Sequence, residues 1–311
     1  MIRHLLEPFD LTKEETEKLL SVAANIEKEP HLYQDLARYK RLATLFYEAS
    51  TRTRLSHETA MQKLGGDVIG FPSADVSSVS KGETVEDTIR IINCYVDIVA
   101  MRHPEAFAPL RASKYSKVPI INAGDGGNEH PTQTLLDMYT IKKRLGRLDN
   151  ITIGFCGDLK FGRTVHSLTK SLTRYSNVHF YFISPEELKM PRKLLSEDMQ
   201  YTETDSLEEA IGKLDILYMT RIQQERFPSP EEYLRFKGVY ILDPEKMSLA
   251  QPHMAVLHPL PRVDEITPEV DDDPRAAYFE QAQNGLYVRM ALIMALLRIK
   301  DPKTDSYILN D

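Results

Sequence analysis

Cysteine and long apolar runs are both scarce in this sequence. The 311 residues include two cysteines, Cys94 and Cys156, and each lies within or beside an apolar run without metal-ligand spacing. We therefore expect two buried thiols in a reducing compartment, the cytoplasm, and no bound metal. The longest late apolar run, residues 290–297, is too short to cross a bilayer, and the amino terminus has no signal-peptide core. No membrane role is expected.

Excess positive charge and a dinucleotide fingerprint are also missing. The net charge of −7 argues against a general nucleic-acid surface, so an anionic ligand must be bound by local arginines. Residues 154–162 contain glycines after a strand-like run but lack the G-x-G-x-x-G spacing, so no cofactor is predicted. The acidic run at residues 271–273 is interpreted as a solvated loop, because nothing nearby has ligand spacing.

The sequence does contain a series of short apolar runs typical of strands in a parallel sheet. They cover residues 42–46, 96–101, 118–122, 151–156, 178–183, 214–219, 238–242 and 254–257. The length, with 42% hydrophobic and 27% charged residues, suits two domains that each bury a core. The predicted fold class is α/β, with two domains that are each a mostly parallel sheet flanked by helices.

Three helices can be placed from their end signals. Thr12, with Glu15 three residues later, forms a capping box that opens a first helix. A second helix is expected over residues 131–145, with proline in its first turn and Gly146 after its end. A third is expected at about residues 285–299, where apolar residues on most sides indicate a buried helix.

Residues 50–54 form a candidate anion-binding segment. They read Ser-Thr-Arg-Thr-Arg and lie between the first apolar run and a helix-like stretch. Ser50 is predicted to cap that helix, and the hydroxyls, the N–H groups of the first turn and Arg52 together suit a phosphate dianion. The motif alone is equally consistent with a capped surface helix whose arginines are solvated.

Other apolar runs are each followed by polar side chains suited to an anion or a carbonyl group. These are Arg102 and His103, His130 and Gln133, Arg163, Arg221 with Gln223, and the segment 258–262. Ligands of open α/β sheets bind beyond the carboxyl ends of the strands, where loops and helix N-termini converge. The candidate binding groups follow that rule.

Six motifs occur in the order found in the catalytic chain of aspartate transcarbamoylase, which this sequence resembles over essentially its whole length. They are YEASTRTR (47–54), MRHP (101–104), NAGDG (122–126), HPTQT (130–134), GDLKFGRTVHS (157–167) and HPLPRVDE (258–265). The resemblance implies a carbamoyl-phosphate-binding domain at residues 1–134, with a C-terminal helix at about 285–311 packing back on it. An aspartate-binding domain would span residues 135–284, with the active site in the interdomain cleft.

The resemblance also implies a reaction and assigns residues to it. The carbamoyl group of carbamoyl phosphate would pass to the amine of L-aspartate, giving N-carbamoyl-L-aspartate and phosphate in de novo pyrimidine biosynthesis. Carbamoyl phosphate would be bound by Ser50, Thr51, Arg52, Thr53, Ser77, Lys81, Arg102, His130, Gln133, Pro259 and Leu260, of which Thr53, Lys81, Arg102 and His130 are catalytic. Aspartate would be bound by Arg163, Arg221 and Gln223. Preset donors at a developing oxyanion, and two arginines for two carboxylates, agree with this chemistry.

Closure and assembly are implied by the same resemblance. Glu48 and Arg226 match residues that link the two domains when the cleft closes. The polar loop at residues 73–82 would give Ser77 and Lys81 to the phosphate site of a neighbouring subunit, so a homotrimer with shared active sites is expected. Whether regulatory chains or a dihydroorotase-like partner attach stays open.

Two alternatives remain at this stage. An ornithine transcarbamoylase would share the phosphate motif and fold, but it should offer acidic and thiol groups where this sequence has Arg221 and no cysteine. A catalytically inactive scaffold would bind carbamoyl phosphate and form no product. The intact set of predicted site residues argues against that second alternative.

Overall fold

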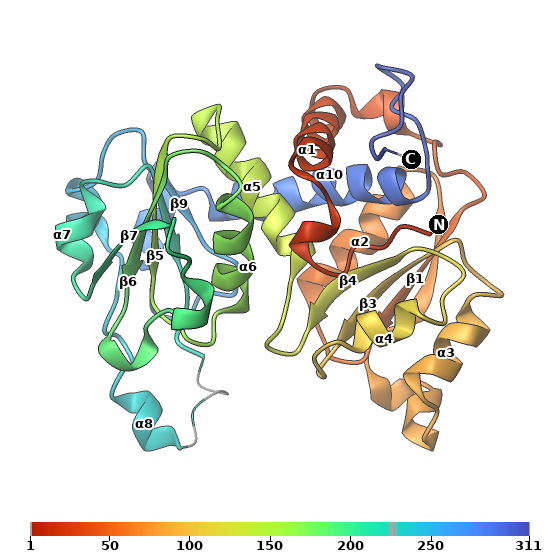
Figure 1. Ribbon diagram of the computed structural model, residues 1–311, viewed down its shortest axis with the longest axis horizontal. Helices are drawn as coiled ribbons and strands as arrows, with labels where there is room; N and C mark the ends of the chain where they lie inside the picture. Colours follow the sequence, from red (N-terminus) through yellow and green to blue (C-terminus); the bar gives the residue numbers. More distant parts are fainter. Residues whose placement is uncertain (1, 224–226, 228, 311) are drawn as a thin grey trace. The chain divides into compact units, whose positions relative to one another are not determined.

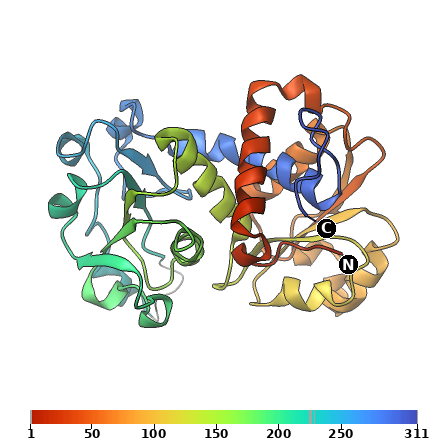
Figure 2. The same ribbon diagram turned by 45° about the horizontal axis from the view of Figure 1, so that its top comes forward.

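The chain forms two compact units in a computed structural model that describes residues 2–223, 227 and 229–310 (Figures 1 and 2). Unit 1 comprises Met1–Tyr139 and Gln283–Asp311, and unit 2 comprises Thr140–Ala282. The chain passes from one unit to the other inside two helices, α5 (Pro131–Leu145) and α10 (Tyr278–Leu296). Each unit is built on one parallel sheet, which confirms the predicted α/β class.

Unit 1 contains a sheet with the strand order β2-β1-β3-β4. The strands are β1 (Arg41–Phe46), β2 (Asp67–Phe71), β3 (Ile98–His103) and β4 (Ile120–Asp125), and all three pairings are parallel. Five of the six residues of β1 are buried, as expected for a central strand with helices on both faces. The continuous apolar run at residues 42–46 therefore reflects its central position.

The remaining elements of unit 1 are helices. They are α1 (Lys13–Lys28), α2 (Thr51–Lys63), α3 (Val85–Ile92) and α4 (Ala108–Ser113), with the 3₁₀ turns η1 (Pro8–Asp10), η2 (Pro30–Tyr33), η3 (Ala74–Val76) and η4 (Ser78–Lys81). Helix α2 packs on β1 and β2, and α4 packs on β3 and β4. Helix α1 begins with the predicted capping box, in which the Thr12 hydroxyl accepts from Glu15 N at 3.1 Å.

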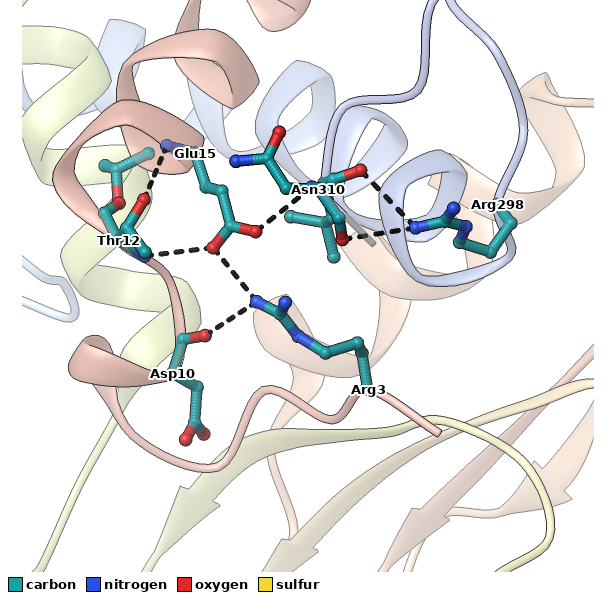
Figure 3. Close-up of polar contacts among 8 residues, drawn as sticks. Arg3, Asp10, Thr12, Glu15, Arg298 and Asn310 are labelled. Carbon is teal, nitrogen blue, oxygen red and sulfur yellow. Dashed lines mark hydrogen bonds and ion pairs between the residues drawn. The ribbon is translucent and has the colours of Figure 1, made fainter. Parts of the chain in front are cut away.

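The carboxylate of Glu15 also joins both ends of the chain to α1 (Figure 3). It accepts from Arg3 Nη2 at 2.9 Å, from Thr12 N at 3.0 Å and from Asn310 N at 3.2 Å. Arg298, just beyond α10, donates to the carbonyl oxygens of Leu309 and Asn310. The C-terminal tail is thus held against the first turn of α1 by one buried carboxylate.

Unit 2 contains a sheet with the strand order β7-β6-β5-β8-β9. The strands are β5 (Ile151–Cys156), β6 (Val178–Ile183), β7 (Gln200–Thr204), β8 (Ile216–Met219) and β9 (Ala255–Leu257), all in parallel pairs. The helices are α6 (Arg163–Leu172), α7 (Leu207–Ile211), α8 (Pro230–Leu234) and α9 (Pro244–Ser248), with the turns η5 (Glu186–Leu188), η6 (Arg192–Leu194) and η8 (Pro268–Asp272). Stacked rings of Phe155, Phe180 and Phe182 fill part of the core between these layers.

The structure differs from the sequence analysis at three places in unit 2 and its last helix. Residues 238–242 form no strand, because Gly238 adopts φ +72° and Leu242 pairs only through an isolated bridge to Ile266 while its side chain enters the core. The edge strand β7 was missed, since its partly polar sequence has no apolar run. Helix α10 begins at Tyr278, seven residues before the predicted start at about 285.

The two cysteines differ in environment, contrary to the prediction that both are buried. Cys156 lies at the end of β5 with no exposed surface, but Cys94 is exposed after α3. The apolar run at residues 96–101 begins only after Cys94, so the thiol lies outside the part of that run which enters the core. Within the described part of the chain, no helix has the length and apolarity needed to cross a membrane.

Candidate functional site

Both sheets have a topological switch point, and several of the predicted site residues follow the strands beside it. In unit 1 the chain leaves β1 for β2 on one side and returns to β3 on the other, so the carboxyl ends of β1 and β3 flank the switch point. Residue pair Phe46 and Arg102 marks those ends in the parallel register. Open α/β sheets bind ligands at this location. The segment 50–54 and Arg102 are therefore brought to the same edge of one sheet.

The first turn of α2 leaves its N–H groups without a side-chain cap. Ser50 occupies the N-cap position, but its hydroxyl accepts no cap hydrogen bond, which corrects the prediction that Ser50 caps the helix. Arg54 is occupied by Glu58 at 3.2 Å, whereas no carboxylate among the described residues pairs with Arg52. The N-terminal end of a thirteen-residue helix carries a partial positive charge. Ser50, Thr51, Arg52 and Thr53 thus present donors to an anion.

Arg102 is partly desolvated and bound to a neighbouring carboxylate. Its guanidinium side chain is 12% exposed, with Nη2 2.7 Å from Glu48 Oε2 and Nη1 donating to Ala123 O at 3.4 Å. Burial lowers the pKa of Arg102, and the Glu48 carboxylate opposes that shift. The buried Nε has no hydrogen-bond partner among the residues that the structure describes. Arg102 therefore retains donor capacity for an incoming anion.

His130 and Gln133 lie at the start of α5. His130 is 5% exposed, and its Nδ1 lies 3.5 Å from Thr132 Oγ1. Gln133 donates through Nε2 to Asp137 Oδ1 at 2.8 Å, which fixes the amide orientation. Asp137 is a positioning residue that sequence reasoning missed, although it lies one helical turn after Gln133, a spacing typical of side-chain pairs.

Ser77 and Lys81 line a hollow that includes none of these donors. Both residues line a surface hollow formed by residues 70–92 alone, among them Ile91 and Ile92. The Ser77 hydroxyl is engaged locally, donating to Ala74 O at 2.8 Å, and Lys81 is exposed. Strand order and register therefore place Ser50, Arg102 and their neighbours at one edge of the first sheet, whereas Ser77 and Lys81 line a hollow whose lining includes none of those residues.

In unit 2 the switch point lies between β5 and β8. Arg163 begins α6 after β5, while Arg221 and Gln223 follow β8. The loops beyond the two strands approach so closely that a Cβ on Gly157, at φ +121°, would lie 2.3 Å from Thr220 O. Both predicted arginines therefore come from the two strands that flank the switch point.

Asp158 ties those two loops together and was not predicted from the sequence. Its carboxylate accepts from Phe161 N at 3.0 Å and Gln223 N at 3.4 Å, and its own N–H donates to Thr220 Oγ1 at 3.1 Å. Burial raises the pKa of Asp158, while the backbone donors oppose the shift. Asp158 lies two residues after the end of β5 and within the motif at residues 157–167, but neither feature alone indicates that it ties two loops together.

Arg221 also lines a cavity of about 140 Å³ within unit 2. The other lining groups include Tyr233, Lys237, Tyr240, Asp264 and Glu265. Lys237 adds a second cation to this cavity, a feature that the sequence analysis did not identify. Pro259 and Leu260 follow β9 on the same sheet and are partly buried, whereas Arg226 lies outside the described residues. In the described part of the chain, no group of three or more His, Cys, Asp or Glu side chains is placed to hold a metal ion.

Comparisons with known proteins agree with this arrangement. Residues 3–143 match the family model "Aspartate/ornithine carbamoyltransferase, carbamoyl-P binding domain", and residues 149–296 match "Aspartate/ornithine carbamoyltransferase, Asp/Orn binding domain". The chain is 57% identical over 303 residues to the aspartate carbamoyltransferase catalytic subunit of Lachnoclostridium phytofermentans, covering 96% of this chain and 99% of that protein. The catalytic subunit of Clostridium novyi is similar at 57% over 302 residues, with the same coverage.

Solved structures show the same relationship. The catalytic subunit of M. jannaschii aspartate transcarbamoylase superposes with a TM-score of 0.89 at 49% identity, covering 96% of this chain and 98% of that one. Aspartate transcarbamoylase from Trypanosoma cruzi in complex with N-(phosphonacetyl)-L-aspartic acid superposes with a TM-score of 0.88 at 38% identity, covering 94% of each chain.

Proposed function

This chain belongs to the aspartate/ornithine carbamoyltransferase family, and we propose that within it the protein is an aspartate carbamoyltransferase. It transfers the carbamoyl group of carbamoyl phosphate to the amine of L-aspartate, giving N-carbamoyl-L-aspartate and phosphate. The observation that carries the choice of aspartate is the pair of arginines, Arg163 and Arg221, beside the switch point of the second sheet. Two guanidinium groups match two carboxylates and repel a cationic side chain.

Unit 1 supplies the groups for carbamoyl phosphate. The phosphate is bound at the N-terminus of α2 by Ser50, Thr51, Arg52 and Thr53. This turn offers backbone N–H groups and the guanidinium of Arg52, which pairs with no carboxylate among the described residues. Arg102 joins them from the end of β3. Thr53, Arg102 and His130 act as preset donors to the carbonyl oxygen, which becomes an oxyanion when the amine attacks. Gln133 orients the carbamoyl group, held by Asp137 at 2.8 Å.

The departing phosphate is the proposed acceptor of the amine proton. Attack by a neutral amine releases one proton, and the phosphate dianion is a base already located at the reacting carbon. This route requires no dedicated protein base, which fits the half-buried, donor-rich surroundings of Arg102 and Gln133. A pH–rate profile that reports an essential protein base, with the same pKa in free enzyme and ligand complex, would contradict it.

Unit 2 supplies the groups for aspartate. Arg163 and Arg221 bind the two carboxylates, and Gln223, whose N–H is fixed by Asp158, orients one of them. Pro259 and Leu260 accept from the carbamoyl nitrogen through their backbone carbonyls. Ornithine is disfavoured because Lys237 lines the same cavity as Arg221, and the thiol of Cys156 is fully buried.

Glu48 is proposed to release Arg102 when phosphate binds. The carboxylate now lies 2.7 Å from Arg102 Nη2, the same face that a phosphate oxygen would take. A dianion competes better for a guanidinium than a half-exposed monoanion does, so binding frees Glu48 for its proposed part in closure. Arg226, its other proposed partner, lies outside the described residues.

We further propose a homotrimer in which Ser77 and Lys81 serve the phosphate site of a neighbouring subunit. The loop that bears them lines a hollow without any of the phosphate-binding residues of its own chain. Ile91, Tyr95 and Leu110, on or after α3 and on the contacting helix α4, are about half exposed, which is unusual for large apolar side chains. A second copy of the chain would cover them.

The cellular role follows from the reaction. We propose that the protein works in de novo pyrimidine biosynthesis in the cytoplasm. The exposed thiol of Cys94 and the buried thiol of Cys156 are both free, which fits a reducing compartment.

A direct assay tests the proposed function. Purified protein is incubated with carbamoyl phosphate and either L-aspartate or L-ornithine, and the carbamoylated amino acid and released phosphate are quantified. Product with aspartate alone is expected. Product with ornithine alone would overturn the two-arginine argument, and binding of carbamoyl phosphate without any product would favour the inactive scaffold.

A further inference from the structure

The loop after β9 is closed upon itself by one histidine and one glutamate. His258 is 2% exposed and Glu265 is 5% exposed, and His258 Nε2 lies 2.6 Å from Glu265 Oε1. The other carboxylate oxygen, Oε2, accepts from Val263 N at 3.1 Å and from Asp264 N at 3.2 Å. Both ends of the segment 258–265 are thereby fixed to each other.

The proton on His258 can be assigned from its partners. Leu260 N donates to His258 Nδ1 at 2.8 Å, so Nδ1 must be the acceptor nitrogen of the ring. The proton of the neutral ring then lies on Nε2, where the Glu265 carboxylate accepts it. His258 N–H also donates to Gln281 Oε1 at 2.9 Å, which anchors the residue to α10. Glu265 therefore selects the tautomer that leaves Nδ1 free to hold Leu260.

Leu260 needs such a restraint because its backbone is strained. Its φ is +50°, in the left-handed region that residues other than glycine and asparagine rarely adopt. A leucine is strained in this region, so the chain relaxes to negative φ unless other contacts hold it. Relaxation would turn the peptide groups on both sides of Leu260 and with them the carbonyls of Pro259 and Leu260.

We propose that His258 and Glu265 are positioning residues for carbamoyl transfer, which hold Leu260 in its left-handed conformation so that the carbonyls of Pro259 and Leu260 meet the carbamoyl nitrogen. This inference rests on the proposed function, because it assigns those carbonyls to the carbamoyl group. Neither side chain touches substrate. Their effect is to distinguish an NH₂ group from a group of the same size that cannot donate.

The matched ligands for the test are phosphonoacetamide and acetonylphosphonate. Both are stable against transfer, carry a phosphonate and a carbonyl, and differ only by an NH₂ group in place of a CH₃ group. Their affinities are measured by calorimetry, with succinate present to occupy the dicarboxylate site. The wild-type protein should bind the amide roughly five- to tenfold more tightly than the ketone, the range expected for hydrogen bonds to two backbone carbonyls.

Three variants separate the two contacts of His258, with Leu260 N and with Glu265. In His258→Asn the side-chain oxygen can still accept from Leu260 N, so preference for the amide should be largely kept. In His258→Gln the amide can reach Glu265 but not Leu260 N, and the preference should fall to about twofold or less. Glu265→Gln should behave like His258→Gln. The NH₂ group of the new glutamine must face either the Nε2–H of His258 or the N–H groups of Val263 and Asp264, so the tautomer with the proton on Nε2 is disfavoured.

A control variant tests histidine loss in the same unit. His253 pairs with Asp215 at 2.7 Å on the surface, and His253→Gln should leave amide preference unchanged. Ketone affinity should stay within about twofold in every variant that keeps the wild-type melting temperature. Equal loss of amide and ketone affinity, or equal behaviour of His258→Asn and His258→Gln, would overturn the proposal.

These outcomes are distinguishable from failure of the proposed function. The binding test does not depend on turnover, so it gives an answer even if the assay with aspartate detects no product. A wild-type protein that turns over substrate but binds amide and ketone equally would retain its function and lose this inference. The proposed function and this inference are both supported if the wild-type protein forms product and prefers the amide, and if only His258→Gln and Glu265→Gln abolish that preference.

Discussion

His57, in α2 directly behind the phosphate-binding turn, is a neutral buried residue. Its side chain has no exposed surface, and Nδ1 donates to Thr53 O at 2.8 Å. Burial lowers the pKa of His57 to about 3, and the nearby charge of Arg289 adds to the shift. The ring therefore stays neutral at physiological pH, with its proton on Nδ1, where it donates to Thr53 O.

Acid stability should depend on His57. Its pKa of about 3 in the folded protein lies below the unfolded value of 6.5, so between these limits only the unfolded chain takes up the proton. Stability is thus lost as pH falls from 6.5, by about 1 kcal/mol per pH unit for one such group. His57→Asn, which keeps a donor for Thr53 O, should flatten this loss between about pH 7 and pH 5. Calorimetric melting at both pH values measures it, and exposed His31→Asn is the control.

Glu48 competes with the anion that Arg102 is proposed to bind. Glu48→Gln removes that competition, so inorganic phosphate should bind roughly three- to tenfold more tightly while the KM for aspartate rises. Phosphate titration and steady-state kinetics give the two quantities. The matched control is Glu105→Gln, which releases Arg111 from a 2.7 Å surface pair in the same unit and should change neither. Weaker phosphate binding in Glu48→Gln would contradict the competition.

Residues proposed to bind a ligand have clearer sequence signals than the residues that hold them in place. Ser50, Arg102 and Arg163 belong to local motifs beside strand ends, so their types and spacing carried the signal. Asp158 and Asp137 act through hydrogen bonds of 2.8 to 3.4 Å to loop N–H groups and to Gln133, and such contacts depend on the fold. Cys94 was wrongly predicted to be buried for a related reason. The exposure of its thiol depends on how the chain packs after α3.

At the scale of elements, the hydrogen bonds of Glu15 shown in Figure 3 should hold the C-terminal tail against α1. Burial opposes ionisation, but hydrogen bonds from Arg3, Thr12 and Asn310 more than offset it and lower the pKa of Glu15. This contribution is therefore complete above the unfolded pKa of 4.5 and is lost as pH falls through the lower folded value. The tail should loosen in acid before the sheet of unit 1 unfolds.

Glu15→Gln should reproduce that loosening at neutral pH. The amide cannot form the ion pair with Arg3, and its NH₂ faces a backbone N–H. Trypsin should then cut at exposed Lys300 and Lys303 several-fold faster, as followed by mass spectrometry. The control variant Glu14→Gln, on the same turn of α1, should be cleaved by trypsin at the wild-type rate. Unchanged cleavage in Glu15→Gln would show that other contacts hold the tail.

Element prediction succeeded where local signals and burial agreed. The helices α1 and α5 have the capping box, proline and glycine that the sequence predicted, and β1 is a buried apolar run. It failed at residues 238–242, which enter the core without pairing along a strand, and at β7, an edge strand of partly polar residues. In both cases, whether the segment forms a strand depends on its neighbours in the sheet, and the local sequence does not show which neighbours it will have.

At the scale of the whole molecule, the same design occurs twice. Each unit has a parallel sheet whose order reverses once, and several of the proposed substrate groups follow the two strands beside that reversal, whereas His130 and Gln133 follow β4 and Pro259 and Leu260 follow β9. In unit 1 the strands beside the reversal are β1 and β3, and in unit 2 they are β5 and β8. The sequence predicted the strand ends, but the reversal depends on strand order, which only the folded sheet reveals. The strand order thus places separate motifs at one edge of each sheet.

The position of Lys81 makes a prediction about assembly. If Lys81 serves a neighbouring subunit, then a chain with Lys81→Ala and a chain with His130→Ala are each inactive alone but complement each other. A site that takes His130 from one chain and Lys81 from the other is intact. Random mixing at equal amounts makes about a quarter of the sites intact, so about a quarter of wild-type activity should return.

The mixing experiment is performed by reversible dissociation in mild denaturant followed by joint refolding. Each variant refolded alone is the control for recovery, and sedimentation gives the size of the product. Activity that returns with a trimeric species supports shared sites, because no single chain in the mixture carries both residues. A trimer without activity would mean that Lys81 acts within its own chain, and recovery should then also fail for Ser77→Ala mixed with His130→Ala, since Ser77 and Lys81 line one hollow.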